Sequence, residues 1–175
     1  MIRTYNIRKG KHSSKPRILK LWAGKTAHSF KFRFNSTMWH EANAIPIDGI
    51  SKACGVAFGT HAENPLNKIP YVRNLINSVV IGWKPNYNFK NQFELYIISD
   101  SRGVEVRTKY FESIPIDKIV DIKVVKINKN LVVVTIDKVG IPVNLNALPF
   151  GYYLGFYYGG QSEAPQDMHE ELEIL

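Results

Sequence analysis

The residues that could do chemistry in this 175-residue sequence are few and scattered. Five histidines occur, and none has the i, i+2 or i, i+4 spacing of a metal-binding pair: His12, His28, His40, His61 and His169. His40-Glu41 could join His61 in a site, because metals favour imidazole and carboxylate ligands together. A loop histidine bonded to backbone or water is the simpler interpretation. We therefore predict no metal site and no cofactor.

Two further positions have a structural and a functional interpretation. Cys54, the one cysteine, lies in an apolar run of small residues, which favours an inert buried thiol over a nucleophile. Asp167 follows two glycines and a proline, so it could bind Ca²⁺ through its carboxylate. We expect instead a turn aspartate that bonds its own backbone.

Four aromatic side chains fall in predicted loops or at strand ends, where their rings could stack on sugars or contact a protein partner. These candidate recognition residues are Trp39, Tyr71, Tyr87 and Phe89. Packing of long loops against the body of the fold would explain them equally well.

The elements that must position these residues are strands. Phe30, Phe32 and Phe34 alternate with Lys31 and Arg33, which predicts a half-buried strand with its phenylalanines in the core. Ten to twelve such runs occur, with turn residues between them, whereas residues 65–78 could hold at most one short helical turn. The pattern predicts one domain over residues 1–175, an all-β, two-sheet antiparallel sandwich.

The charge is unevenly placed along the chain. The net charge is +8, and residues 1–33 hold ten cations and no acid, whereas five acids and no Lys or Arg lie in residues 163–175. We expect the two ends to be neighbours in one sheet, with opposite charges facing each other. A contact between subunits or with a polyanion remains the alternative. The candidate assembly residues are Arg3, Arg8, Lys9, Lys11, Lys15 and Arg17.

Three pieces of the sequence resemble a concanavalin-like jelly roll. They are the opening Tyr5-x-Ile7-x-Lys9-Gly10, the block from Cys54 to His61, and the closing Tyr157-Tyr158-Gly159-Gly160-x-x-x-Ala164-Pro165-x-Asp167-Met168. The closing piece is similar to an ending in β-sandwich proteins of unknown function from gut bacteria and their tailed phages. The resemblance implies a sandwich whose first and last strands are adjacent.

This fold family contains glycan hydrolases and lyases, whose motifs would be visible in the sequence. Sandwich-type retaining glycosidases carry Glu-x-Asp-x-Glu on a strand, because two carboxylates about 5 Å apart must flank the sugar bond. The nearest string here is Glu171-x-Glu173, which we expect on a solvated edge strand. The Gln-x-His motif of sandwich-type alginate lyases is absent, since Gln166 is followed by Asp167 and Met168.

These absences predict a non-catalytic structural or recognition module with no catalytic residues. We expect a phage virion component, such as a capsid-surface, fibre or tail attachment protein, with other virion subunits as partners. It would lie in the virion or in the host cytoplasm during assembly, because no secretory signal is visible. The alternatives are a lectin-like carbohydrate-binding domain, a glycan-cleaving enzyme, or a polyanion binder. We expect neither nucleic-acid nor membrane contact.

Overall fold

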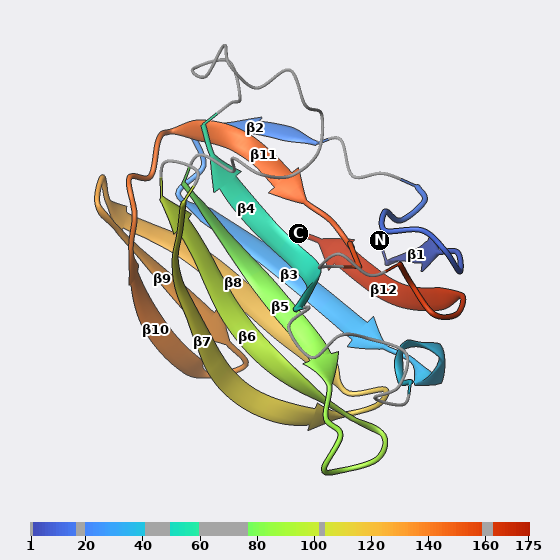
Figure 1. Cartoon of the computed structure of the whole chain (residues 1–175). Helices are drawn as coiled ribbons and strands as arrows, with labels where there is room; N and C mark the ends of the chain where they lie inside the picture. Colours follow the sequence, from blue (N-terminus) through green and yellow to red (C-terminus); the bar gives the residue numbers. More distant parts are fainter. Residues whose placement is uncertain (1, 17–19, 41–49, 60–76, 102–103, 159–162) are drawn as a thin grey trace.

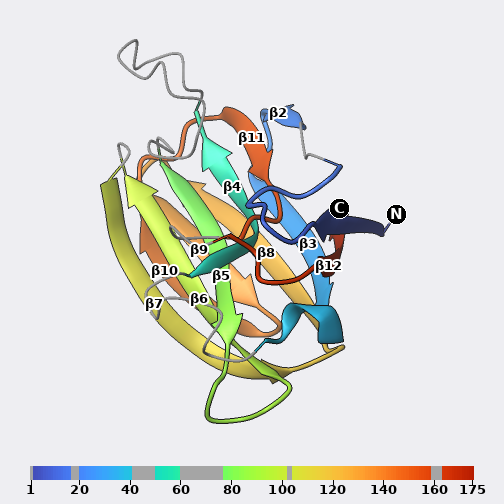
Figure 2. The ribbon, with the colours of Figure 1, turned by 45° about the vertical axis from the view of Figure 1, so that its right-hand side comes forward.

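Alternating apolar and polar side chains build two antiparallel sheets of six strands each, packed face to face (Figures 1 and 2). The computed structural model describes residues 2–16, 20–40, 50–59, 77–101, 104–158 and 163–175. The predicted all-β jelly-roll sandwich is thus confirmed. In the described part of the chain, helix is confined to the single 3-10 turn η1 (Ser36–Met38).

Each sheet mixes strands from distant parts of the chain. The first sheet has the order β1 (Arg3–Ile7), β12 (Met168–Ile174), β3 (Ala27–Phe34), β8 (Ile119–Asn128), β9 (Leu131–Ile136) and β10 (Val139–Asn144). The second has the order β2 (Leu21–Ala23), β11 (Phe150–Leu154), β4 (Ser51–Phe58), β5 (Ser78–Pro85), β6 (Gln92–Ser101) and β7 (Val104–Pro115). Both views show β4 to β7 in front of β8 to β10.

The core fills the space between the two sheets. Phe30, Phe32 and Phe34 of β3 are each 1% exposed, as their alternation predicted. Phe34 lies against the rings of Trp83 and Phe93 from the second sheet, at centroid distances of 5.2 and 5.0 Å. Because side chains alternate between faces, the same register sends Lys31 and Arg33 outward. The predicted register of this strand is therefore confirmed.

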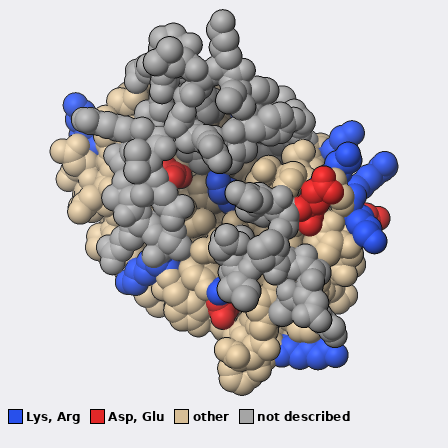
Figure 3. Space-filling view, in the orientation of Figure 1, with Lys and Arg blue, Asp and Glu red and all other residues tan. Residues whose placement is uncertain are grey.

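The two ends of the chain lie side by side. β12 pairs with β1 on one side and with β3 on the other, so the predicted adjacency of first and last strands is confirmed. Arg33 donates to Glu171 at 2.7 Å, and the Lys9 amide donates to Asp167 at 2.7 Å. Figure 3 shows basic and acidic side chains gathered together beside this end of the sheet.

One local prediction needs correction, and another falls mainly outside the described residues. Glu171 and Glu173 do not lie on an edge strand, because β1 covers the far side of β12. β11 ends at Leu154, and beyond it Tyr157 makes isolated bridges to Ser13 and Lys52. The possible helical turn at residues 65–78 lies mainly outside the described residues.

Within the described part of the chain, no helix has both the length and the apolar character needed to cross a membrane.

Candidate functional site

The outer face of the second sheet carries a group of polar and aromatic side chains on three neighbouring strands. The register of β5, β6 and β7 places Lys84, Glu94 and Ser113 in one row across the sheet. In the next row, Tyr96 on β6 lies opposite Tyr110 on β7. Residues i and i+2 of a strand point to the same face, so Glu94 and Tyr96 project together. We call Lys84, Glu94, Tyr96 and Tyr110 the tyrosine–lysine cluster.

Hydrogen bonds and ion pairing connect three members of the cluster. The Tyr96 hydroxyl donates to a carboxylate oxygen of Glu94, and the Lys84 ammonium lies 3.1 Å from that same oxygen. The ammonium also lies 5.4 Å from the centroid of the Tyr96 ring. The ring of Tyr110 meets that of Tyr96 edge to face, with centroids 5.8 Å apart. One carboxylate, one ammonium and two phenols therefore meet on the outer face of the sheet, where Tyr110 is exposed and the other three are partly buried.

The surroundings shift the pKa values of two cluster members. Partial burial is the main cause that raises the pKa of Tyr96, and its hydrogen bond to Glu94 raises it further. Partial burial lowers the pKa of Lys84, but hydrogen bonds to Tyr96 and Glu94 outweigh it, so the net shift is upward. The phenol thus holds its proton and the amine its charge at neutral pH.

A buried asparagine supports the cluster from the β5–β6 loop. Asn86 is 4% exposed, and its side-chain amide donates to Ser113 Oγ at 2.8 Å. That Ser113 oxygen lies 3.3 Å from the Tyr110 hydroxyl. The side-chain oxygen of Asn86 accepts from the amides of Asn88 and Phe89, which fixes the start of the loop. The loop and the cluster are therefore held together as one unit.

This arrangement can bind an anion and move a proton. A phenol hydrogen-bonded to a carboxylate can pass its proton to that carboxylate as it accepts another, which is general acid–base chemistry. When Glu94 takes up a proton, the charge of Lys84 is no longer neutralised and becomes available to an anionic group.

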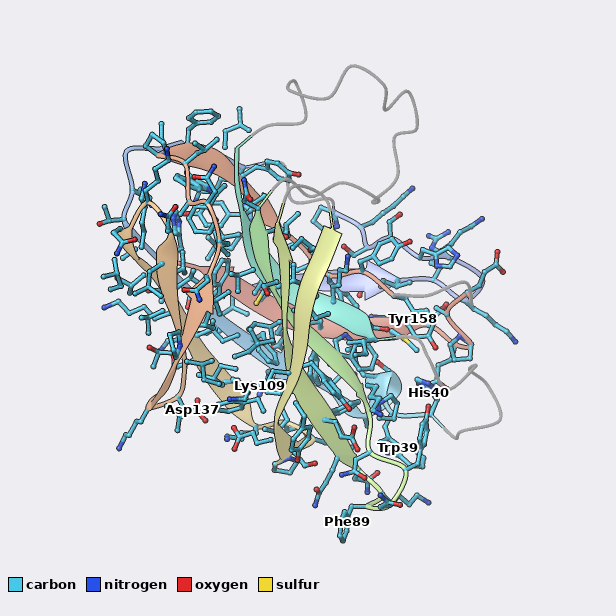
Figure 4. All side chains as sticks on the ribbon, turned by 60° about the vertical axis from the view of Figure 1, so that its left-hand side comes forward. Trp39, His40, Phe89, Lys109, Asp137 and Tyr158 are labelled. Atoms are coloured by element: carbon cyan, nitrogen blue, oxygen red, sulfur yellow. The ribbon has the colours of Figure 1, made fainter. Side chains whose placement is uncertain are left out.

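The structure places three of the four predicted recognition aromatics at one end of the sandwich. Phe89, 61% exposed, lies on the β5–β6 loop, and Trp39 lies after η1 (Figure 4). Tyr87, on the same loop, is 41% exposed. The Lys90 ammonium, 5.8 Å from the Trp39 ring centroid, links the two segments. Partial burial raises the pKa of Tyr87, with smaller effects from Lys84 and Glu94, so Tyr87 lies close to the cluster. Tyr71 lies outside the described residues.

The other candidate chemical residues have structural environments. His40 is buried, and its Nδ1 lies 3.1 Å from the Met38 carbonyl oxygen, as expected of a histidine bonded to backbone. Cys54 is fully buried, and burial raises the pKa of its thiol. Asp167 does not bond its own backbone as expected, but accepts from the backbone amide of Lys9 in the turn after β1. Among the described residues, no group of three His, Cys, Asp or Glu side chains could hold a metal ion; Glu41 and His61 are not among them.

The basic residues of the first segment surround β1 and the loop that follows it. Arg3, Lys9 and Lys11 are exposed or partly exposed there, near the acidic end of the chain. The Gly10 amide donates to the Ala164 carbonyl at 2.9 Å, which joins the two segments. The remaining candidate assembly residues are Arg8 and Lys15, also exposed, and Arg17, which lies outside the described residues.

Sequence reasoning missed the tyrosine–lysine cluster. Its members are separated by up to 26 positions, and only the pairing of three strands brings them together. One local signal was present: Glu94-x-Tyr96 inside a predicted strand puts an acid and a phenol on the same face.

Comparison with known proteins gives a fold and no family. The sequence matches no known protein family and no curated protein. The structure is similar to that of an alginate lyase, AlyC3, with a TM-score of 0.59 and 10% identity over 98% of this chain and 74% of the other. A family 18 polysaccharide lyase gives a TM-score of 0.52 and 11% identity over 99% and 86% of the two chains. A lichenase derived from a mouse hindgut metagenome gives a TM-score of 0.51 and 8% identity, over 99% of this chain and 78% of the other.

These findings correct the predicted function. The expectation of a non-catalytic phage virion module was wrong, because the solved structures that resemble this one include two polysaccharide lyases and a lichenase, which cleave glycans. The absence of a catalytic sequence string does not exclude glycan cleavage, because residues far apart in the sequence can meet on one sheet face. At about 10% identity the similarity establishes a shared fold, and the chain is a concanavalin-like jelly-roll β-sandwich.

Proposed function

We propose that this protein cleaves an anionic glycan on the outer face of its second sheet, and that the tyrosine–lysine cluster carries the reaction. The observation that supports this most is the Lys84–Glu94–Tyr96 contact, which combines a cation with a phenol–carboxylate pair on an accessible sheet face. The similar solved structures include two polysaccharide lyases, one of them an alginate lyase, which makes a glycan the natural ligand to test.

Elimination fits the cluster better than hydrolysis. Retaining hydrolysis needs two carboxylates about 5 Å apart, and inverting hydrolysis needs them about 6.5–9.5 Å apart. The tyrosine–lysine cluster contains one carboxylate, that of Glu94, so it lacks the second carboxylate that either kind of hydrolysis needs. Asp100 lies on the same strand and face, but six residues of strand place it about 20 Å away.

The proposed reaction is β-elimination at a uronic acid. Tyr96 Oη accepts the proton of the carbon next to the sugar carboxylate, while its own proton moves to Glu94. The electron pair of that C–H bond forms the new C=C bond, and the bond from the neighbouring carbon to the glycosidic oxygen breaks. The proton then returns from Glu94 through Tyr96 to the leaving oxygen. Lys84 neutralises the sugar carboxylate while Glu94 carries the proton.

The test is to incubate the full chain with polyuronates, alginate among them, and with a neutral mixed-linkage β-glucan. Elimination leaves an unsaturated sugar, so we expect ultraviolet absorbance to grow with one polyuronate and not with the glucan. Tyr96→Phe should lower kcat by at least about 100-fold, because it removes the proton carrier and keeps the ring.

Tyr152→Phe is the matched control. Tyr152 is a partly buried tyrosine on the same face, but in the row of Ala57 and Ser78, away from the cluster. This variant should keep full activity. New reducing ends without an unsaturated product would refute elimination. Binding of glycan without any cleavage would refute the enzymatic proposal and leave a lectin-like domain.

A further inference from the structure

The row of Tyr96 and Tyr110 continues across the second sheet well beyond the tyrosine–lysine cluster. Tyr96 lies opposite Gly82 of β5, Gly82 lies opposite Lys52 of β4, and Lys52 is bridged to Tyr157. Directly paired residues of antiparallel strands point to the same face, so Lys52 and Tyr157 share the face of Tyr96. The burial pattern agrees, because Phe156 and Tyr158 on either side of Tyr157 are buried in the core.

The far end of this row carries a flat stack of two rings. His12 and Tyr157 lie with ring centroids 5.8 Å apart and an interplanar angle of 17°, and both are partly exposed. The stack is anchored by backbone: Lys52 and Tyr157 exchange two hydrogen bonds of 2.8 and 2.9 Å, and the Tyr158 amide donates to the His12 carbonyl at 2.8 Å. Because the backbone under both rings is fixed, the segments that carry them need no reordering when a ligand binds.

Between the two ends, the row has an apolar floor. Gly82 has no side chain, and a Cβ there would lie 2.6 Å from Ile50 Cγ2 and 2.8 Å from Ile98 Cδ1. The two isoleucines therefore close over the glycine backbone. Polar and aromatic groups at both ends of an apolar strip suit a sugar chain, whose rings have apolar faces and polar edges.

We propose that His12, Tyr157 and Lys52 form a second glycan subsite, which binds the same chain that the tyrosine–lysine cluster cleaves. This inference rests on the proposed function. Three strand-to-strand steps separate Tyr157 from Tyr96, about 14 Å or the length of about three sugar units. The stacked rings bind a sugar face, and Lys52 pairs with a carboxylate of the anionic chain. The substrate thus runs across the strands, and its length decides whether it reaches the subsite.

The test is a length series of oligouronates, from two to eight units, with the wild type and Tyr157→Ala. We expect KM for the long oligomers to rise about tenfold in the variant, with kcat and the values for the shortest oligomers unchanged. Tyr157→Phe keeps the ring and should behave as the wild type. Thermal unfolding of each variant shows whether the fold is intact.

Other outcomes separate the subsite from the proposed function. Equal effects on short and long oligomers, or no effect on long ones, would overturn the subsite and leave the cleavage proposal standing. If no glycan is cleaved, the binding of long and short oligouronates is compared between the wild type and Tyr157→Ala. Weaker binding of the long oligomers alone would support the subsite, and equal effects on both lengths would overturn it. Absence of any glycan binding would overturn both proposals.

Discussion

Glu170 provides a sharp test of how this core tolerates a carboxyl group. It lies on β12 between Tyr5 of β1 and Phe34 of β3, faces the core and is 0% exposed. Neither carboxyl oxygen has a hydrogen-bond partner among the residues that the structure describes, and burial raises the pKa of Glu170 well above its ordinary value. A buried polar group without a partner costs about 1–3 kcal/mol. Glu170→Met, of similar volume, should therefore stabilise the protein by about 1–3 kcal/mol, or roughly 2–12 °C in Tm.

The pH dependence follows from the direction of this shift. Below the unfolded-state pKa near 4.5, both states hold the proton and the group causes no pH-dependent loss. As the pH rises from there towards the folded-state pKa, the unfolded chain releases the proton and the folded chain keeps it, so stability falls by up to about 1.4 kcal/mol per pH unit.

The measurement is urea unfolding of wild type, Glu170→Gln and Glu170→Met at several pH values between 4 and 8. The difference in unfolding free energy between wild type and Glu170→Gln isolates this one carboxyl group, since all other titrations are shared. We expect the difference to grow with pH in favour of glutamine. A flat difference, or a loss of stability in Glu170→Met, would show that the carboxyl group has a compensating partner and refute the reasoning.

Two further predictions concern packing. Phe32→Ala should destabilise the protein by about 3–5 kcal/mol, because the ring is 1% exposed between the sheets. Lys31→Ala, on the opposite face of the same strand, should change stability by less than about 1 kcal/mol. Similar losses for the two variants in urea unfolding would mean that the strand register is wrong. Gly151→Ala should destabilise by about 1–3 kcal/mol or prevent folding, because its Cβ would lie 1.9 Å from the Ala57 carbonyl oxygen. Gly140→Ala is the control, since its nearest contact is 3.5 Å away, and a thermal shift as large as that of Gly151→Ala would contradict the clash argument.

Local patterns were enough for the fold but not for the candidate site. The alternation of Phe30, Phe32 and Phe34 predicted both the strand and its buried face, because period-two patterning follows directly from strand geometry. The opposite charges of the two chain ends predicted their adjacency. The tyrosine–lysine cluster has no such local pattern, since Lys84, Glu94 and Tyr110 come from three strands whose pairing register no single stretch of sequence specifies.

The acidic last strand shows where local reasoning could have gone further. The position of Glu171 and Glu173 at the end of the chain predicts a solvated edge strand, and the same stretch contains Glu170. The alternation Met168, Glu170, Leu172 already puts Glu170 on the apolar face of the strand. The alternation therefore predicts that Glu170 is buried, whereas the acidic composition of the whole segment predicts that it is exposed.

The charge distribution also bears on where an anionic ligand would bind. The basic first segment has its own acidic counterpart: Arg33 pairs with Glu171, Lys31 with Asp121, and the backbone around Lys9 with Asp167. These exposed contacts each contribute little to stability, because water screens them, but they neutralise the first sheet locally. Lys84 differs because its partner Glu94 also bonds a phenol and can exchange a proton with it. When Glu94 takes the proton of Tyr96 during a reaction, the charge of Lys84 becomes available to an anionic substrate. Activity is therefore expected on the outer face of the second sheet and not at the more basic first segment.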